Sequence, residues 1–281
     1  MKKLLVTAAC AAGGIVFAYA ENSIETLIQS GKLKVNLTSL GGHRGDCVEA
    51  EIENLTADSL EVTFEAGRRL VAGDSSEQDI FLVKENSVKL APKENRKRAL
   101  FGFCCQSHDH SPKKGGKFSI GFLAPIAWLK LATIINKGDY DESAVQQAVW
   151  AISNNHPTAS IPVGIRHENY PLIATVAGIK GEPIPWYFIQ YAHDPDQLFS
   201  NVPVQLKGQI KYEVTSYGVV TISVTNENAK SMQTIEEIMP KMVGKRVYRV
   251  NLNVYKWPHG KYTVTIQDHT SAVLARKTFE I

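Results

Sequence analysis

FGFCCQSHDHSP, residues Phe101–Pro112, lies where the chain changes from strand-like to helical patterns. Before it, short alternating or β-branched runs are separated by turn-forming residues, as is typical of antiparallel sheets. After Phe118–Phe122 the apolar residues take a helical spacing instead. We therefore interpret the stretch as the end of a sheet strand next to a helical segment, and we predict a mainly β protein.

The region before this junction, residues 21–122, is predicted to form a β-sandwich. Leu33, Val35 and Leu37 alternate with polar residues, and further short runs follow. Turn-rich segments at 54–58, 66–76 and 92–98 separate the runs, and such spacing is typical of a sandwich. The runs are Val48–Glu53, Ser59–Glu65, Gln78–Lys84 and Ser87–Ala91.

The segment after it, residues 123–192, is predicted to hold a helical hairpin followed by extended chain. A weaker third helix is expected over Pro171–Ala177, and two prolines in Gly181–Ala192 favour an extended conformation. Residues 193–206 are interpreted as a linker. The apolar stripes of the two hairpin helices are Trp128, Leu131, Ala132 and Ile135, and then Val145, Ala148, Val149 and Ile152.

Residues 207–281 are predicted to form a second all-β domain. Gly208–Thr215 and Val219–Thr225 flank Ser216–Gly218, which indicates a hairpin turn. Strict alternation returns at Tyr248, Val250, Leu252 and Val254 and again at Tyr262, Val264 and Ile266.

The end of the chain carries a resemblance to a known family. Trp257–Ile266 (WPHGKYTVTI), followed by Arg276–Ile281 (RKTFEI), resembles the C-terminal sorting domain of type IX secretion cargo. The immunoglobulin-like domain of flagellar hook-capping proteins is similar. The resemblance implies an immunoglobulin-like sandwich with Tyr262 on its core face, and a possible sorting role. Our expected fold is two immunoglobulin-like β-sandwich domains with a small helical hairpin region between them.

The first twenty residues have the pattern of a secretory signal peptide. Lys2 and Lys3 precede an apolar run, and Ala18-Tyr19-Ala20 fits a cleavage site. Acylation of Cys10, as in a lipoprotein, is the alternative. We expect a secreted protein in the periplasm, on the cell surface or outside the cell, with no transmembrane segment in the mature chain. Removing the two lysines leaves a formal charge of +1 (3 − 2), so nucleic acid is not an expected partner.

Three cysteines remain after such a cleavage, and they allow two structural hypotheses. In an oxidising compartment Cys47 is expected to form a disulfide with Cys104 or Cys105. Alternatively, Cys104 and Cys105 with His108 and His110, and His43 nearby, supply ligands suited to zinc.

A third hypothesis comes from a second resemblance. Phe103-Cys104-Cys105 resembles the aromatic-Cys-apolar motif of thioester-containing adhesin domains, and Gln146–Trp150 (QQAVW) resembles their Gln-x-Ala-apolar-Trp helix. In that family a Cys and a Gln side chain condense to a thioester with loss of ammonia. The resemblance implies Cys104 or Cys105 as the thiol, and Gln190 as the glutamine partner.

No hydrolase or phosphate-binding motif is present in the sequence: Gly-x-Ser-x-Gly and His-Glu-x-x-His are both absent. We therefore expect a non-enzymatic binding or structural protein without a cofactor. Its partner would be a protein or a surface glycan, and Trp150, Trp186 and Tyr187 are the candidate contact residues. A covalent adhesin with a Cys–Gln thioester is the alternative.

Overall fold

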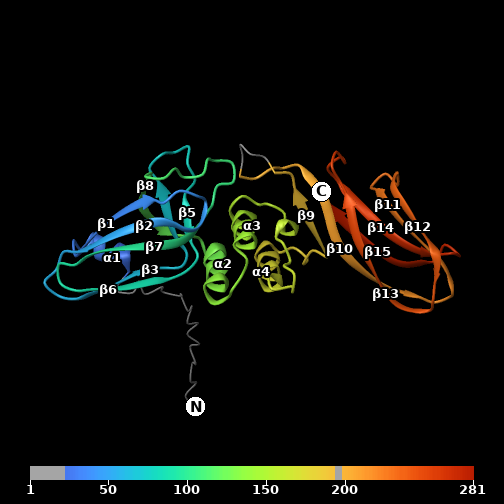
Figure 1. Ribbon diagram of the computed structural model, residues 1–281, viewed down its shortest axis with the longest axis horizontal. Helices are drawn as coiled ribbons and strands as arrows, with labels where there is room; N and C mark the ends of the chain where they lie inside the picture. Colours follow the sequence, from blue (N-terminus) through green and yellow to red (C-terminus); the bar gives the residue numbers. More distant parts are fainter. Residues whose placement is uncertain (1–22, 194–197) are drawn as a thin grey trace, which may run out of the picture.

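The computed structural model describes residues 23–193 and 198–281, so the predicted signal peptide lies outside the described part. The protein is mainly β, as predicted. Figure 1 shows a barrel at one end, helices in the middle and the C-terminal sheets at the other end. Within the described ranges, no helix is long and apolar enough to cross a membrane.

The N-terminal β region is a closed barrel and not the predicted open sandwich. Its strands close in the order β1-β2-β7-β5-β4-β8 because β8 pairs with both β1 and β4. Helix α1 (Ile24–Gln29) and a two-stranded sheet of β3 (Leu60–Phe64) and β6 (Asn86–Leu90) share its apolar core. The barrel strands are β1 (Leu33–Ser39), β2 (Arg44–Asn54), β4 (Arg68–Ala72), β5 (Ile80–Leu82), β7 (Asn95–Cys104) and β8 (Lys117–Leu123).

Two barrel strands lie in segments that the sequence assigned to turns. β4 falls within 66–76, and the first residues of β7 fall within 92–98. The basic side chains of β7 are balanced by acidic residues on β2, its neighbour. Lys97 lies opposite Glu51 in the register, and its Nζ is 2.8 Å from Oε1 of Glu49. Charge pairing across the strands therefore accommodates a polar sequence in the outer face of the barrel.

The predicted helical segment is confirmed, including the third helix. It consists of α2 (Ile126–Lys137), α3 (Glu142–Ser153), the short 3-10 helix η1 (Thr158–Ser160) and α4 (Tyr170–Lys180). The apolar stripes of α2 and α3 meet Phe81, Phe103 and Cys105 of the barrel wall in a second core. This packing fixes α3 against the end of β7.

The C-terminal region consists of two sheets that share a third apolar core. Their orders are β13-β10-β9 and β12-β11-β14-β15. The predicted hairpin of β10 and β11 is wrong, because these strands belong to different sheets and β10 pairs with β13 and β9. The strands are β9 (Tyr187–Tyr191), β10 (Pro203–Val214), β11 (Gly218–Asn226), β12 (Ser231–Lys241), β13 (Gly244–Asn253), β14 (Lys261–Asp268) and β15 (Val273–Glu280).

Tyr262 lies on the core face of β14, as the family resemblance implied. Its side chain is buried, and its ring stacks on Phe279 with the ring centroids 5.4 Å apart. The hydroxyl donates a hydrogen bond to the carbonyl oxygen of Pro258 at 2.6 Å. A buried tyrosine with a paired hydroxyl stabilises the core without an unsatisfied polar group.

Candidate functional site

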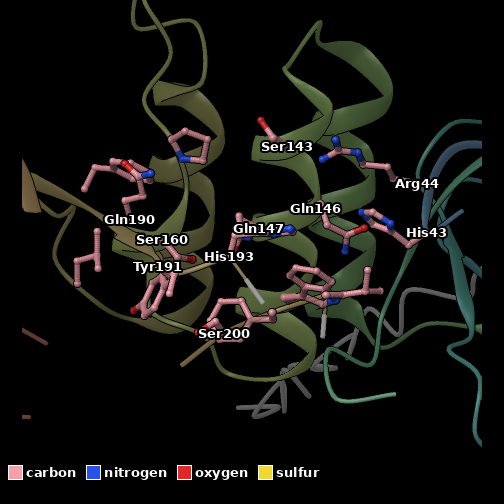
Figure 2. A pocket seen from close by; sticks show the side chains of 17 residues that line it. His43, Arg44, Ser143, Gln146, Gln147, Ser160, Gln190, Tyr191, His193 and Ser200 are labelled. Atoms are coloured by element: carbon pink, nitrogen blue, oxygen red, sulfur yellow. The ribbon is translucent and has the colours of Figure 1, made fainter. Parts of the chain in front are cut away.

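A cavity of about 310 Å³ lies between α3, η1 and β9. The rest of its described lining consists of His43 and Arg44 of the barrel, Pro162, Ala192, His193 and Leu198–Ser200. Figure 2 shows the α3 side chains on one side of this cavity and Gln190 and Tyr191 of β9 on the other. The helical segment and the C-terminal sheets therefore build the site together.

Helix α3 presents a second stripe to this cavity, beside the apolar stripe that it presents to the core. Ser143, Gln146, Gln147 and Trp150 have the spacing i, i+3, i+4 and i+7, and all four line the cavity. Gln146 and Trp150 were predicted as members of one motif, Gln146–Trp150. The shared spacing is the signal that could have joined them with Ser143 and Gln147.

Four polar atoms of the cavity lining have no hydrogen-bond partner in the structure. They are Oε1 of Gln146, Oε1 of Gln147, Nε1 of Trp150 and Oγ of Ser160. Gln146 and Trp150 are each 2% exposed, and Ser160 is 3% exposed. Buried polar groups are nearly always paired, with protein or with water. Four unpaired ones around a single cavity therefore mark the place where water or a bound group would supply their partners.

The orientation of the Gln146 amide is fixed from the side of the barrel. Its Nε2 donates a hydrogen bond of 2.8 Å to the carbonyl oxygen of Cys104, the last residue of β7. This bond uses one of the two N–H donors of the amide and leaves the amide oxygen free as an acceptor. In Figure 2 the Gln146 side chain is directed toward His43.

An aromatic cluster adjoins the cavity. The Phe199 ring lies over that of His156, with centroids 3.8 Å apart, and contacts the rings of Trp150 at 5.9 Å and Tyr191 at 5.2 Å. Burial raises the pKa of Tyr191 to about 12. Its phenol therefore stays protonated at neutral pH and offers an apolar face to the cavity.

The ionisable side chains of the described lining are those of His43, Arg44, Tyr191 and His193. Burial, followed by the charge of Arg44, lowers the pKa of His43, which is therefore mostly uncharged at neutral pH. Arg44 is 41% exposed, and its Nε lies 3.9 Å from Oε2 of Glu142. Among the described lining residues there is no carboxylate. Most polar side chains of the described lining are thus uncharged.

The three cysteines outside the predicted signal peptide are free and buried, so the predicted disulfide is not formed. Cys47 lies at a bulge of β2, and its thiol points to the carbonyl oxygen of Gly102 at 3.7 Å. Cys104 shares the barrel core with Cys47, whereas Cys105 faces the core under the helices. Burial raises the pKa of Cys47 and Cys105 to about 12, and that of Cys104 further. These thiols are protonated at neutral pH, which makes them poor nucleophiles.

The residues of the thioester hypothesis are neighbours, but the thiols do not line the cavity. Gln146 contacts the backbone of Cys104, and Gln190 lies across the cavity on β9. The Cys105 sulfur instead lies 3.4 Å from the carbonyl oxygen of Asp79. The structure therefore brings the two motifs together without placing a thiol beside Gln190 in the cavity.

The other predicted site residues lie outside the cavity. His108 and His110 are exposed on the loop after β7, and within residues 23–193 and 198–281 no group of three or more metal-ligating side chains is assembled. The zinc hypothesis is therefore not supported. Trp186 donates from Nε1 to the carbonyl oxygen of Thr278 at 2.6 Å, and the Tyr187 hydroxyl accepts from the Glu280 amide at 3.1 Å. Both rings pack against β15.

The histidine of the aromatic cluster is buried, and it was not predicted from the sequence. His156 is 6% exposed, and its Nε2 lies 2.9 Å from Oγ of Ser107. Burial, with smaller contributions from His108 and Lys180, lowers the pKa of His156 to about 4. No motif marks this residue in the sequence.

The low pKa of His156 predicts a loss of stability in mild acid. The unfolded chain takes up this proton near pH 6.5 and the folded chain only near pH 4. The contribution is therefore fully present above pH 6.5 and falls as the pH is lowered toward 4, by about 3 kcal/mol in total. Urea denaturation from pH 7 to pH 4.5 measures this slope. The dependence of stability on pH should weaken in His156→Phe and persist in the control His259→Phe, an exposed histidine away from His156. Equal pH dependence in wild type and His156→Phe would contradict the assignment.

No protein-family model and no curated protein matches the chain. Two solved structures of a beta-glucosidase from Kluyveromyces marxianus, the second in complex with glucose, are similar over 83% of this chain. Their sequence identities are 11% and 9%, both TM-scores are 0.21, and the match covers 44% of their chains. The chain thus spans less than half the length of these proteins. At this TM-score the similarity supports no statement about fold or activity.

Proposed function

We propose that the protein is a secreted, non-enzymatic binding protein that holds a small uncharged group of its partner in the cavity between α3 and β9. The unpaired atoms of Gln146, Gln147, Trp150 and Ser160 carry this proposal. Amide, indole and hydroxyl groups bind by hydrogen bonds and do not titrate near neutral pH. Secretion rests on the pattern of Met1–Ala20, and the C-terminal sheets are proposed to form an immunoglobulin-like sandwich that supports one wall of the site.

Nuclear magnetic resonance with a library of neutral fragments (primary amides, alcohols and polyols) tests this function. The protein has four tryptophans, and the Trp150 indole signal is assigned by its loss in Trp150→Phe. Because Nε1 of Trp150 is unpaired, binding fragments should shift its signal. The indole of Trp186, which is bonded to Thr278, is an internal control and should not move. If no fragment moves the Trp150 signal, the binding function is wrong.

The covalent adhesin remains a second candidate because of one observation, the hydrogen bond between Gln146 and the Cys104 carbonyl. It joins the two motifs that resemble the thioester family. In the reaction the cysteine sulfur would form a bond to the glutamine carbonyl carbon while the amide nitrogen leaves as ammonia. Intact-mass spectrometry of the secreted protein separates the candidates. If binding is non-covalent, we expect the mass of the fully reduced chain. A thioester would lower this mass by that of one ammonia, and treatment with methylamine would then raise it by the mass of one methylamine.

A further inference from the structure

Resting on this binding function, we infer that the group held in the cavity is an uncharged saccharide unit of a glycan. The unit presents hydroxyls to α3 and η1 and a C–H face to the aromatic rings. Hydrogen-bond chemistry, charge and the shape of the lining each support this assignment.

The unpaired atoms require a ligand that both donates and accepts. Oε1 of Gln146 and Oε1 of Gln147 need donors, while Nε1 of Trp150 needs an acceptor. A hydroxyl does both with one oxygen, and neighbouring hydroxyls on a sugar ring repeat this pattern over a short distance. The Ser160 hydroxyl can take either role. A set of vicinal hydroxyls can therefore satisfy the whole group.

Charged ligands fit this set less well. An ammonium group only donates, so it would leave Trp150 unpaired, and it would lie near Arg44 without a carboxylate in the described lining. A carboxylate or phosphate only accepts, so it would leave Oε1 of Gln146 and Oε1 of Gln147 without a donor. Arg44 is also already paired with Glu142 at the rim. Leaving a buried polar group unpaired costs more than a hydrogen bond contributes, so both classes are disfavoured.

The lining across from the glutamines includes aromatic side chains. Phe188 and Tyr191 of β9 line the cavity beside Gln190, and the Phe199 ring contacts the rings of both Tyr191 and Trp150. Aromatic rings bury large apolar areas, and the C–H face of a pyranose is the apolar side of a sugar. A ring lying between the two walls would thus place its hydroxyl edge toward Gln146 and Gln147. The volume of about 310 Å³ is at the lower end of the range for small-molecule pockets, about 300–1,000 Å³, so the recognised unit is small.

Gln147 is the residue whose substitution should change the binding affinity with the least effect on stability. It is half-buried, and its amide oxygen has no partner within the protein. Gln147→Leu should therefore leave the melting temperature close to that of the wild type while it weakens binding. Gln233→Leu, at an exposed position on β12 outside the cavity, is the matched control.

The test is a titration of the full secreted chain with glucose, galactose, mannose, N-acetylglucosamine and their disaccharides, followed by the Trp150 indole signal. A glycan array with neutral, sialylated and sulfated glycans accompanies it. We expect at least one neutral saccharide to shift the signal, with affinity reduced about tenfold or more in Gln147→Leu and unchanged in Gln233→Leu.

The outcomes separate the two proposals. If neutral amides or alcohols shift the Trp150 signal but no saccharide does, the saccharide inference is wrong and the binding function stands. Preference for charged glycans or for a peptide also overturns the inference. If no probe of any class shifts the signal, both proposals fall. Equal affinities of wild type and Gln147→Leu for a bound saccharide would place that sugar elsewhere on the protein and likewise overturn the inference.

Discussion

Replacing Arg68 by alanine is expected to lower the free energy of unfolding by about 3–5 kcal/mol, because the change breaks a buried ion pair by removing one partner. The Arg68 side chain is fully buried. Its Nη1 lies 2.8 Å from Oε2 of Glu25, and its Nε and Nη2 lie 3.1 and 3.0 Å from the two carboxylate oxygens of Glu65. Nη1 also donates to the carbonyl oxygen of Gly121 at 2.9 Å. One guanidinium thus connects α1, β4 and β8 where the barrel closes.

Two further variants separate the contribution of the Arg68 charge to stability from that of its side-chain volume. Arg68→Met fills much of the space but leaves Glu25 and Glu65 without their partner, so it should remain strongly destabilised. Arg96→Ala is the exposed control: Arg96 is 39% exposed and pairs with Glu94, and such surface pairs contribute about 0–1 kcal/mol. Urea denaturation followed by circular dichroism gives all three values. A stability of Arg68→Met close to that of the wild type would show that the ion pairs contribute nothing.

The sequence predicts those elements whose pattern depends only on residues close together in the chain. The stripes of α2 and α3 and the alternation in β13 and β14 depend on neighbours in the chain, and these elements were predicted correctly. Barrel closure depends on β8 pairing with β1 and β4, which lie roughly 45 to 80 residues earlier. Nothing in the local pattern distinguishes that pairing from an open sandwich. The composition of Ser216–Gly218 is typical of a hairpin turn. In the fold, however, β10 and β11 lie in different sheets.

The residues of the candidate site also divide into those that a local motif predicts and those that only the fold brings together. Gln146 and Trp150 could be selected because their motif is local, and the cavity lies beside them. His156 and Ser160 both follow α3, whereas Phe199 lies about 40 residues later and reaches His156 only in the fold. Trp186 and Tyr187 were selected as aromatic residues in a proline-containing segment, yet the pairing of β9 with β10 carries that segment onto the C-terminal sheets. The burial of all three cysteines likewise could not be deduced from their spacing.

Trp150 is expected to serve both the fold and the site, and two substitutions can separate these roles. Trp150→Ala removes one of the largest fully buried side chains and should cost about 3–5 kcal/mol of stability. Trp150→Phe keeps an aromatic ring beside Phe199 and removes the indole N–H, which has no partner inside the protein. It should therefore cost only about 1–2 kcal/mol, mainly through lost volume.

Stability and binding affinity are measured on the same samples. Urea denaturation gives the stability, and titration with a neutral fragment or saccharide that the wild type binds gives the affinity. Trp150→Phe should remain folded at 25 °C and still bind about tenfold or more weakly, because the acceptor that faced the indole N–H is left unpaired in the complex. A Trp150→Phe variant as unstable as Trp150→Ala would mean that the N–H is bonded within the fold itself. Since the other unpaired atoms surround the same cavity, that outcome would make the cluster a structural network completed by water and would remove the main support for a binding site between α3 and β9.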